Sequence, residues 1–127
     1  NICKPFSLRE ACKDGNCVSA QIERNARLLA DPKLPKRDRV MALAYLTHFV
    51  GDLAQPMHGG DRGDLGGNQV PMTYGVVSGR ANLHSVWDGW LAERAVTTPP
   101  GGVAGLLAGL SPEQKAALAG GTVEDWS

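Results

Sequence analysis

The sequence has no excess of charge of either sign, because Lys plus Arg and Asp plus Glu each number 13 among its 127 residues. A protein that holds nucleic acid mainly by releasing counterions is normally basic, so the composition argues against that class. If the protein handles a polyphosphate chain, the positive charge must come from another source, such as bound metal. The sequence also has no run of about 18 apolar residues, so we expect no membrane span.

No signal-peptide pattern opens the chain, so we expect Asn1 to follow a processing event, an engineered boundary or a deletion. The length allows at most one domain with a modest core. Hydrophobic residues make up 43% and charged residues 20%, which is typical of a globular chain.

Cysteines are few, and the three present lie near the start, at Cys3, Cys12 and Cys17. Cys12 and Cys17 enclose a turn-forming Asp-Gly-Asn, and a local disulfide can close this short loop. Cys3 would then be left over and, in a secreted protein, would pair with a partner outside the sequence. Two alternatives stay open: three reduced thiols in a cytosolic protein, or three zinc ligands, although the absence of a CxxC pair disfavours zinc.

The apolar pattern predicts an all-α fold, because no segment shows the alternation of a half-buried strand. Residues 37–54 form the most apolar predicted helix, so we expect neighbours to surround it fully, and Pro56 ends or kinks it. Residues 59–80 should form a long glycine-rich loop. The other predicted helices span residues 19–31, 82–95 and 111–120. The first has Ile22, Ala26, Leu29 and Ala30 on its apolar side. The last has Ser111 as N-cap and Gln114 at the capping-box position.

All three histidines lie close to aspartates in apolar surroundings. His48 and Asp52 are four residues apart and therefore share one helix face; His84 and Asp88 repeat this spacing. His58 follows the proline break, where the chain can turn back towards the end of its own helix. Imidazoles and carboxylates together make a ligand set suited to zinc. The alternative is that these are ordinary hydrogen-bonded pairs in a helical core.

The stretches LTHFVGDLAQPMH, GGN and NLHSVWD together resemble the core signature of the S1/P1 nuclease family. These enzymes are zinc-dependent, all-helical and secreted, and are related to bacterial zinc phospholipase C. The resemblance is close over residues 40–90 and looser in the flanks. It implies a helical phospholipase C/P1 nuclease-like fold and a secreted or periplasmic location.

The resemblance also implies a cluster of three zinc ions. His48 and Asp52 match ligands of the two paired ions, and Asp52 matches the bridging, catalytic carboxylate. His58, His84 and Asp88 match the three protein ligands of the third ion. Leu65 and Asn68 match loop positions that line the family's base-binding pocket; the alternative for Asn68 is an ordinary turn in which it bonds its own backbone.

The implied activity is cleavage of single-stranded DNA or RNA to 5′-phosphorylated products, with removal of 3′-phosphates from nucleotides as a further activity. Metal-activated hydroxide would attack phosphorus, and zinc charge would let a neutral protein grip phosphate.

The sequence departs from the family at its start. The family uses an N-terminal tryptophan, an early histidine, and a further upstream aspartate and histidine as zinc ligands, and no histidine precedes His48 here. We therefore expect residues 1–127 to be an internal fragment of a single all-α zinc nuclease domain. The third-zinc ligands would be complete, the paired site partial, and the fragment inactive unless other chains supply the missing portions. The family also implies a partner for Cys3 far towards the C-terminus.

Two other functions remain possible: a phospholipase C-like zinc phosphodiesterase, and a non-catalytic helical binding module that zinc stabilises. The glycine-rich polar loop argues mildly against the first. Chelation separates the second from an enzyme, because a structural zinc site unfolds when its metal is removed.

Overall fold

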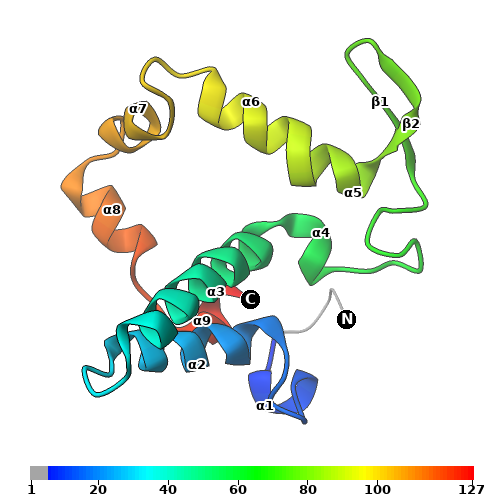
Figure 1. The fold of residues 1–127 in the computed structure, drawn as a ribbon. Coiled ribbons are helices and arrows are strands. Elements are labelled where there is room, and N and C mark those ends of the chain that lie inside the picture. The colour runs from blue at the N-terminus through cyan, green and yellow to red at the C-terminus, as the bar shows by residue number, and fades with distance from the viewer. Residues whose placement is uncertain (1–5) are drawn as a thin grey trace. The chain divides into compact units, whose positions relative to one another are not determined.

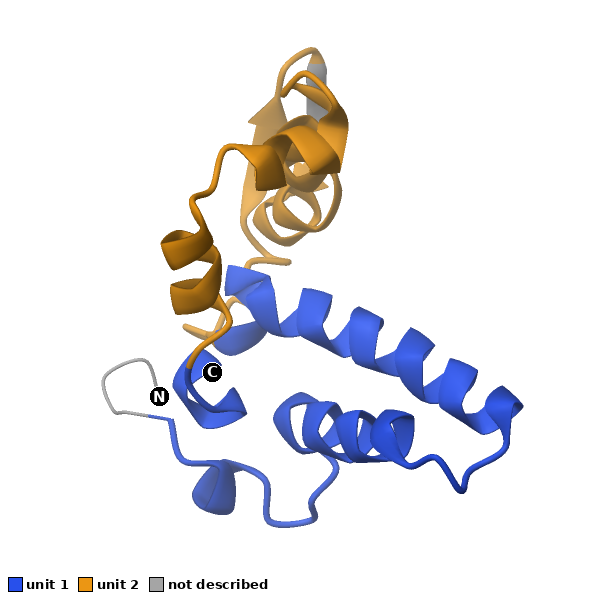
Figure 2. Cartoon of the chain, turned by 90° about the vertical axis from the view of Figure 1, so that its left-hand side faces the viewer, with its two compact units in different colours: residues 1–59, 121–127 blue, residues 60–120 orange. Residues whose placement is uncertain are grey.

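The computed structural model describes residues 6–127, and at residues 77–80 it describes the backbone alone. Cys3, for which we expected a distant partner, lies outside the described residues. The chain divides into two compact units, Asn1–Gly59 with Gly121–Ser127, and Gly60–Gly120 (Figure 2). Each unit is described by itself.

The first unit is built on two helices, α2 (Val18–Ala30) and α3 (Lys36–Ala54), which pack side by side (Figure 1). The described residues of this unit also form three short helices: α1 (Leu8–Ala11), α4 (Pro56–Gly59) and α9 (Val123–Trp126). The C-terminal α9 packs against α2, and a hydrogen bond joins the hydroxyls of Ser19 and Ser127 at 2.9 Å. The predicted disulfide is confirmed, since Cys12 and Cys17 are bonded immediately before α2.

The buried side of α2 agrees with the predicted apolar side at Ile22 but not at Ala26 and Ala30. Ser19, Ile22 and Asn25 are buried, spaced three residues apart, whereas Ala26 and Ala30 are exposed. The two polar members have hydrogen-bond partners, because Ser19 pairs with Ser127 and the Asn25 amide donates to the carbonyl of Gln21 at 2.8 Å. Position on the helix therefore decided burial more than side-chain polarity did.

The expectation that α3 is fully surrounded is wrong for the described chain. Among the described residues of this helix only Ala42 is buried, and five large apolar side chains are 43–54% exposed: Val40, Met41, Leu43, Tyr45 and Val50. The main helix packed against α3 is α2, which covers a single stripe.

The second unit contains a hairpin that the sequence pattern did not predict. Strands β1 (Pro71–Tyr74) and β2 (Val77–Asn82) pair antiparallel within the expected loop. A two-residue turn at Gly75–Val76 joins them, and Gly75 has a φ of +59°, which such turns favour. The loop expectation is therefore correct only for the residues before Pro71. The fold class is nevertheless confirmed as predominantly helical.

A continuous helical stretch follows the hairpin where the sequence predicted one. It consists of α5 (Leu83–Ser85), the π-helix η1 (Val86–Leu91) and α6 (Ala92–Thr97). The hairpin is anchored to it by Tyr74, whose ring stacks on Trp90 with centroids 5.6 Å apart. Helix α7 (Gly102–Ala108), which was not predicted, packs against α6.

The predicted capping box of α8 (Pro112–Leu118) is confirmed. The Ser111 hydroxyl accepts from the backbone N–H of Gln114, and the Gln114 side chain accepts from the N–H of Ser111. Thr122 and Asp125 form the same motif at α9.

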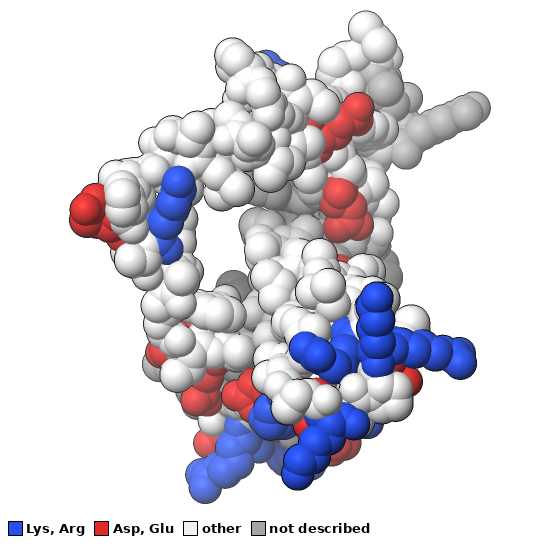
Figure 3. All heavy atoms as spheres, turned by 60° about the vertical axis from the view of Figure 1, so that its left-hand side comes forward, with Lys and Arg blue, Asp and Glu red and all other residues white. Residues whose placement is uncertain are grey.

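Charge is unevenly distributed despite the neutral total. Figure 3 shows Lys and Arg side chains gathered in the lower part of the view, where α2 and α3 lie. Residues 24–39 carry six basic side chains, all exposed, against two aspartates. None of the described helices is both long enough and apolar enough to cross a membrane.

Among the described residues of the first unit, Ile22 is the large apolar side chain with the least exposure, 3%. Replacing it with alanine should lower the free energy of unfolding by about 2–5 kcal/mol, because the cavity left in the core cannot close fully. Chemical denaturation measures this change. As a control, Leu118→Ala at a 69% exposed position should change it by less than about 0.5 kcal/mol. Equal effects of the two variants would contradict the described core.

Candidate metal centre

The first candidate ligand pair lies near the end of α3. His48 and Asp52 are one helical turn apart, and His48 Nε2 is 3.2 Å from Asp52 Oδ2. The other carboxylate oxygen of Asp52, Oδ1, is 3.8 Å from Nδ1 of His58. One carboxylate therefore lies between two imidazoles.

His58 reaches Asp52 because proline ends the helix. In a continuous helix the carbonyl of Asp52 would accept the N–H of residue 56, but Pro56 has none. This carbonyl instead accepts a bond of 2.9 Å from Nδ1 of His58, along with the N–H of Gln55 at 3.3 Å. The predicted turn back towards the helix end is therefore confirmed. In the neutral ring this places the proton on Nδ1 and the lone pair on Nε2 of His58.

The second pair lies where α5 passes into η1. His84 Nε2 is 3.2 Å from Asp88 Oδ2, again one turn apart. The start of this helix is fixed by a capping box between Asn82 and Ser85. Asp88 lies within the six-residue π-helical segment, a distortion that occurs frequently at functional sites.

The ring of His84 is oriented by the preceding loop. Its Nδ1 donates to the carbonyl of Gly66 at 2.9 Å, so in the neutral ring the lone pair is on Nε2. Metal-binding histidines usually donate their other ring N–H to a carbonyl or carboxylate in this way.

The spacing within both pairs fits zinc. Zinc–nitrogen and zinc–oxygen bonds of about 2.0–2.2 Å in a tetrahedron place neighbouring ligand atoms about 3.3 Å apart. The 3.2 Å distances in the His48–Asp52 and His84–Asp88 pairs match that value. Each pair could thus supply two corners of a tetrahedral site.

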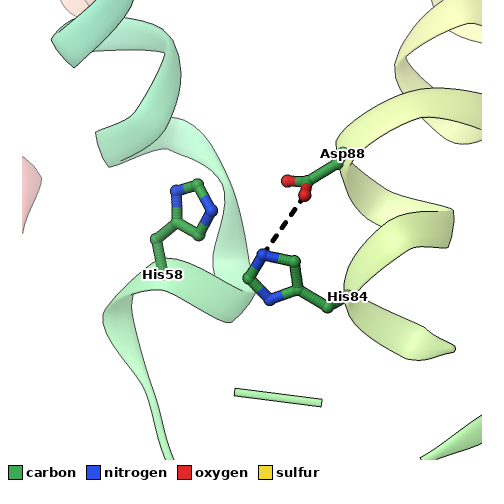
Figure 4. A group of neighbouring side chains, drawn as sticks. All are labelled: His58, His84 and Asp88. Carbon is green, nitrogen blue, oxygen red and sulfur yellow. Dashed lines mark ion pairs between the residues drawn. The ribbon is translucent and has the colours of Figure 1, made fainter. Parts of the chain in front are cut away.

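His58 in the first unit, and His84 and Asp88 in the second, each offer one imidazole nitrogen or carboxylate oxygen that could bind a metal ion. Figure 4 draws the three side chains, and its dashed line marks the His84–Asp88 pair.

A pocket of about 700 Å³ lies in the first unit, with Asp52 and His58 in its lining. Phe49 and Leu53 provide part of its apolar wall. A largely apolar wall with a few polar groups is typical of sites that bind small molecules.

Leu65 and Asn68 lie in the loop before the hairpin. Leu65 is 62% exposed and has a φ of +56°, a left-handed conformation that is uncommon for a non-glycine residue. The Asn68 amide donates to the carbonyl of Leu65 at 2.9 Å. The local turn considered for Asn68 is thus present, and its oxygen also accepts from Asn82 at 3.4 Å.

The sequence analysis did not identify the groups that orient the rings of His58 and His84, because both are backbone carbonyls, of Asp52 and Gly66. The pattern X-Pro-X-His in QPMH was the available signal for the first. No residue-type signal marks the second.

Residues 2–117 match the family described as S1/P1 Nuclease, and the chain belongs to the S1/P1 nuclease family. Endonuclease 3 of Arabidopsis thaliana is 44% identical over 57 residues, which are 45% of this chain and 19% of that protein. Nuclease P1 of Penicillium citrinum is 29% identical over 85 residues, 67% of this chain and 30% of that protein. Endonuclease 2 of Arabidopsis thaliana is 32% identical over 100 residues, which are 71% of this chain and 34% of that protein. The matched segments thus span about a fifth to a third of these relatives.

Asp61 lies in the loop that also contains Leu65 and Asn68. Its pKa is below its ordinary value of 3.8, chiefly because the Gly66 N–H donates to the carboxylate and secondly because the Gly63 N–H does so. Because the pKa of Asp61 is lower in the folded state, its ionised carboxylate stabilises the fold. This stabilisation is complete above pH 3.8 and is lost as the pH falls through the pKa of the folded state. An NMR titration of the Asp61 carboxyl carbon should therefore give a midpoint below 3.8. A midpoint at or above 3.8 would contradict the described loop.

Proposed function

We propose that this chain contributes metal ligands to a zinc-dependent phosphodiesterase that cleaves single-stranded DNA or RNA to 5′-phosphorylated products and also acts on 3′-nucleotides. Membership of the S1/P1 nuclease family supports the reaction class. The observation that carries the metal assignment is the pair of 3.2 Å His–Asp spacings, one on each of two helical segments.

In this proposal, His48 and Asp52 bind the paired zinc ions, with Asp52 as the bridging carboxylate. His58, His84 and Asp88 bind the third ion. The remaining ligands of the paired site would come from residues outside this sequence. Zinc, when bound, supplies Lewis-acid polarisation of the phosphate and an activated water.

The residues of this chain have separate tasks in the reaction. The backbone carbonyls of Asp52 and Gly66 hold the Nδ1 protons of His58 and His84, and so keep each Nε2 available as a ligand. Leu65 is exposed and precedes Gly66 and Gly67. Leu65 and Asn68 are proposed to contact a nucleic-acid base. Base stacking in such a pocket requires unpaired strands.

We further propose that the protein acts outside the cytoplasm, secreted or periplasmic. The Cys12–Cys17 disulfide supports this proposal, because disulfides persist in oxidising compartments and are rare in the cytosol.

Asp52→Asn should reduce turnover of single-stranded DNA by at least about 10²-fold in the complete zinc-loaded protein, because a bridging carboxylate contributes several kcal/mol of charge stabilisation. Initial rates at saturating zinc measure this loss. Asp38→Asn, in the first turn of the same helix, is the matched control and should keep the parent rate. Normal turnover of Asp52→Asn would eliminate the proposed bridging role.

His84→Ala should lower the zinc content at limiting metal by about one ion per chain and slow turnover. The physical reason is that a site with two remaining protein ligands holds zinc weakly. Elemental analysis with rate measurements tests this, and Glu93→Ala on the exposed side of α6 should change neither quantity. Unfolding on chelation without any turnover by the zinc-loaded protein would instead favour a structural zinc module.

A further inference from the structure

Asp61 organises the loop before the hairpin through a single carboxylate oxygen. Its Oδ1 accepts three backbone N–H bonds, from Gly63 at 2.9 Å, Asp64 at 3.1 Å and Gly66 at 3.3 Å. The side chain is exposed, and neither the ligand set nor the base-binding proposal includes it. Such a bonding pattern fixes the path of the chain over six residues.

The third of these bonds connects Asp61 to the metal centre. Gly66 donates its N–H to Asp61 and accepts the Nδ1–H of His84 at its carbonyl, at 2.9 Å. Gly66 is buried, with a φ of +59°, a conformation that leaves little freedom to any residue with a side chain. The orientation of this carbonyl therefore depends on the bonds that hold the loop.

We propose that Asp61 is a positioning residue for the metal ligand His84, acting through the peptide groups of the 61–66 loop and the carbonyl of Gly66. The inference rests on the proposed function in taking His84 as a zinc ligand. Asp61 does not itself bind metal in this account. Its carboxylate holds the N–H of Gly66, the Gly66 carbonyl favours the Nδ1–H tautomer of His84, and zinc would then bind at Nε2, which lies 3.2 Å from Asp88 Oδ2.

A neighbouring aspartate has a different effect. Asp64 Oδ1 accepts from the N–H of Gly67 at 3.0 Å, and the carbonyl of Gly67 accepts from the backbone N–H of His84 at 3.4 Å. Because the Gly67 N–H and the Gly66 carbonyl belong to one peptide group, Asp64 holds the peptide that contacts the imidazole ring. Asp61 instead holds the preceding Leu65–Gly66 peptide, and it also bonds the N–H groups of Gly63 and Asp64, so it fixes the loop that leads to that contact.

The test uses the complete protein labelled with ¹⁵N-histidine. In the metal-free state the parent should show the His84 proton on Nδ1, and Asp61→Ala should shift it towards Nε2. Zinc affinity at the His84 site, measured by chelator competition, should fall by about 10–100-fold, the usual effect of losing a group that supports a metal ligand. Asp14→Ala is the matched control, because Asp14 accepts a similar loop N–H, from Asn16 at 3.1 Å, without reaching a histidine; it should leave both quantities unchanged.

Two further variants keep the proposal falsifiable. Asp61→Asn retains an acceptor oxygen without its charge and should recover part of the affinity, and it supplies the measurement if the alanine variant does not fold. In a His84→Ala background, Asp61→Ala should cause little additional loss, because both changes act on one ligand. A parent-like tautomer in Asp61→Ala, or an undiminished loss in the double variant, would overturn the proposal. The tautomer is read without metal or turnover, so absence of nuclease activity would count only against the proposed function.

Discussion

The candidate centre depends on hydrogen bonds from imidazole N–H groups to backbone carbonyls. A neutral histidine can bind a cation only through the nitrogen without a proton, so the partner of the other nitrogen decides which atom is available. The carbonyls of Asp52 and Gly66 fill this role for His58 and His84. Both carbonyls are available because the backbone around them is irregular: a proline removes the competing N–H at the end of α3, and a left-handed glycine turns the peptide before the hairpin. Breaks in regular structure are thus part of how the ligands are oriented.

Much of the ligand arrangement could be predicted from sequence because it is local. Residues four apart on a helix share a face whatever surrounds them, so the His48–Asp52 and His84–Asp88 pairs were predictable. The return of His58 towards its own helix followed from Pro56. The capping box at Ser111 is similarly a matter of a few neighbouring residues. The prediction of zinc came from the family resemblance, since a four-residue separation of His and Asp in the sequence is equally compatible with a hydrogen-bonded pair.

The features that sequence did not indicate depend on contacts between segments or on rare backbone conformations. The strands of the hairpin have four and six residues, too short for alternation to be distinguished from a loop. The π-helical turn at Asp88 has no compositional signature. The three bonds to Asp61 require left-handed residues at Gly63, Leu65 and Gly66, and a left-handed leucine would not be inferred from its identity. For α3, an apolar composition predicted full burial, but composition cannot tell which segments cover a helix.

Exposure separates the metal interpretation from that of core histidines. A His–Asp pair retained for hydrogen bonding in a core would be removed from water, since an imidazole there loses hydration and needs a partner. The five side chains are instead 20–69% exposed, with His84 the lowest and His48 the highest. Exposed ion pairs contribute little stability by themselves, so stability does not explain why these groups converge in pairs. A catalytic metal site needs both the convergence and an open side for water and substrate, and the proposed ligands meet both requirements, since hydrogen bonds orient them and their side chains remain accessible.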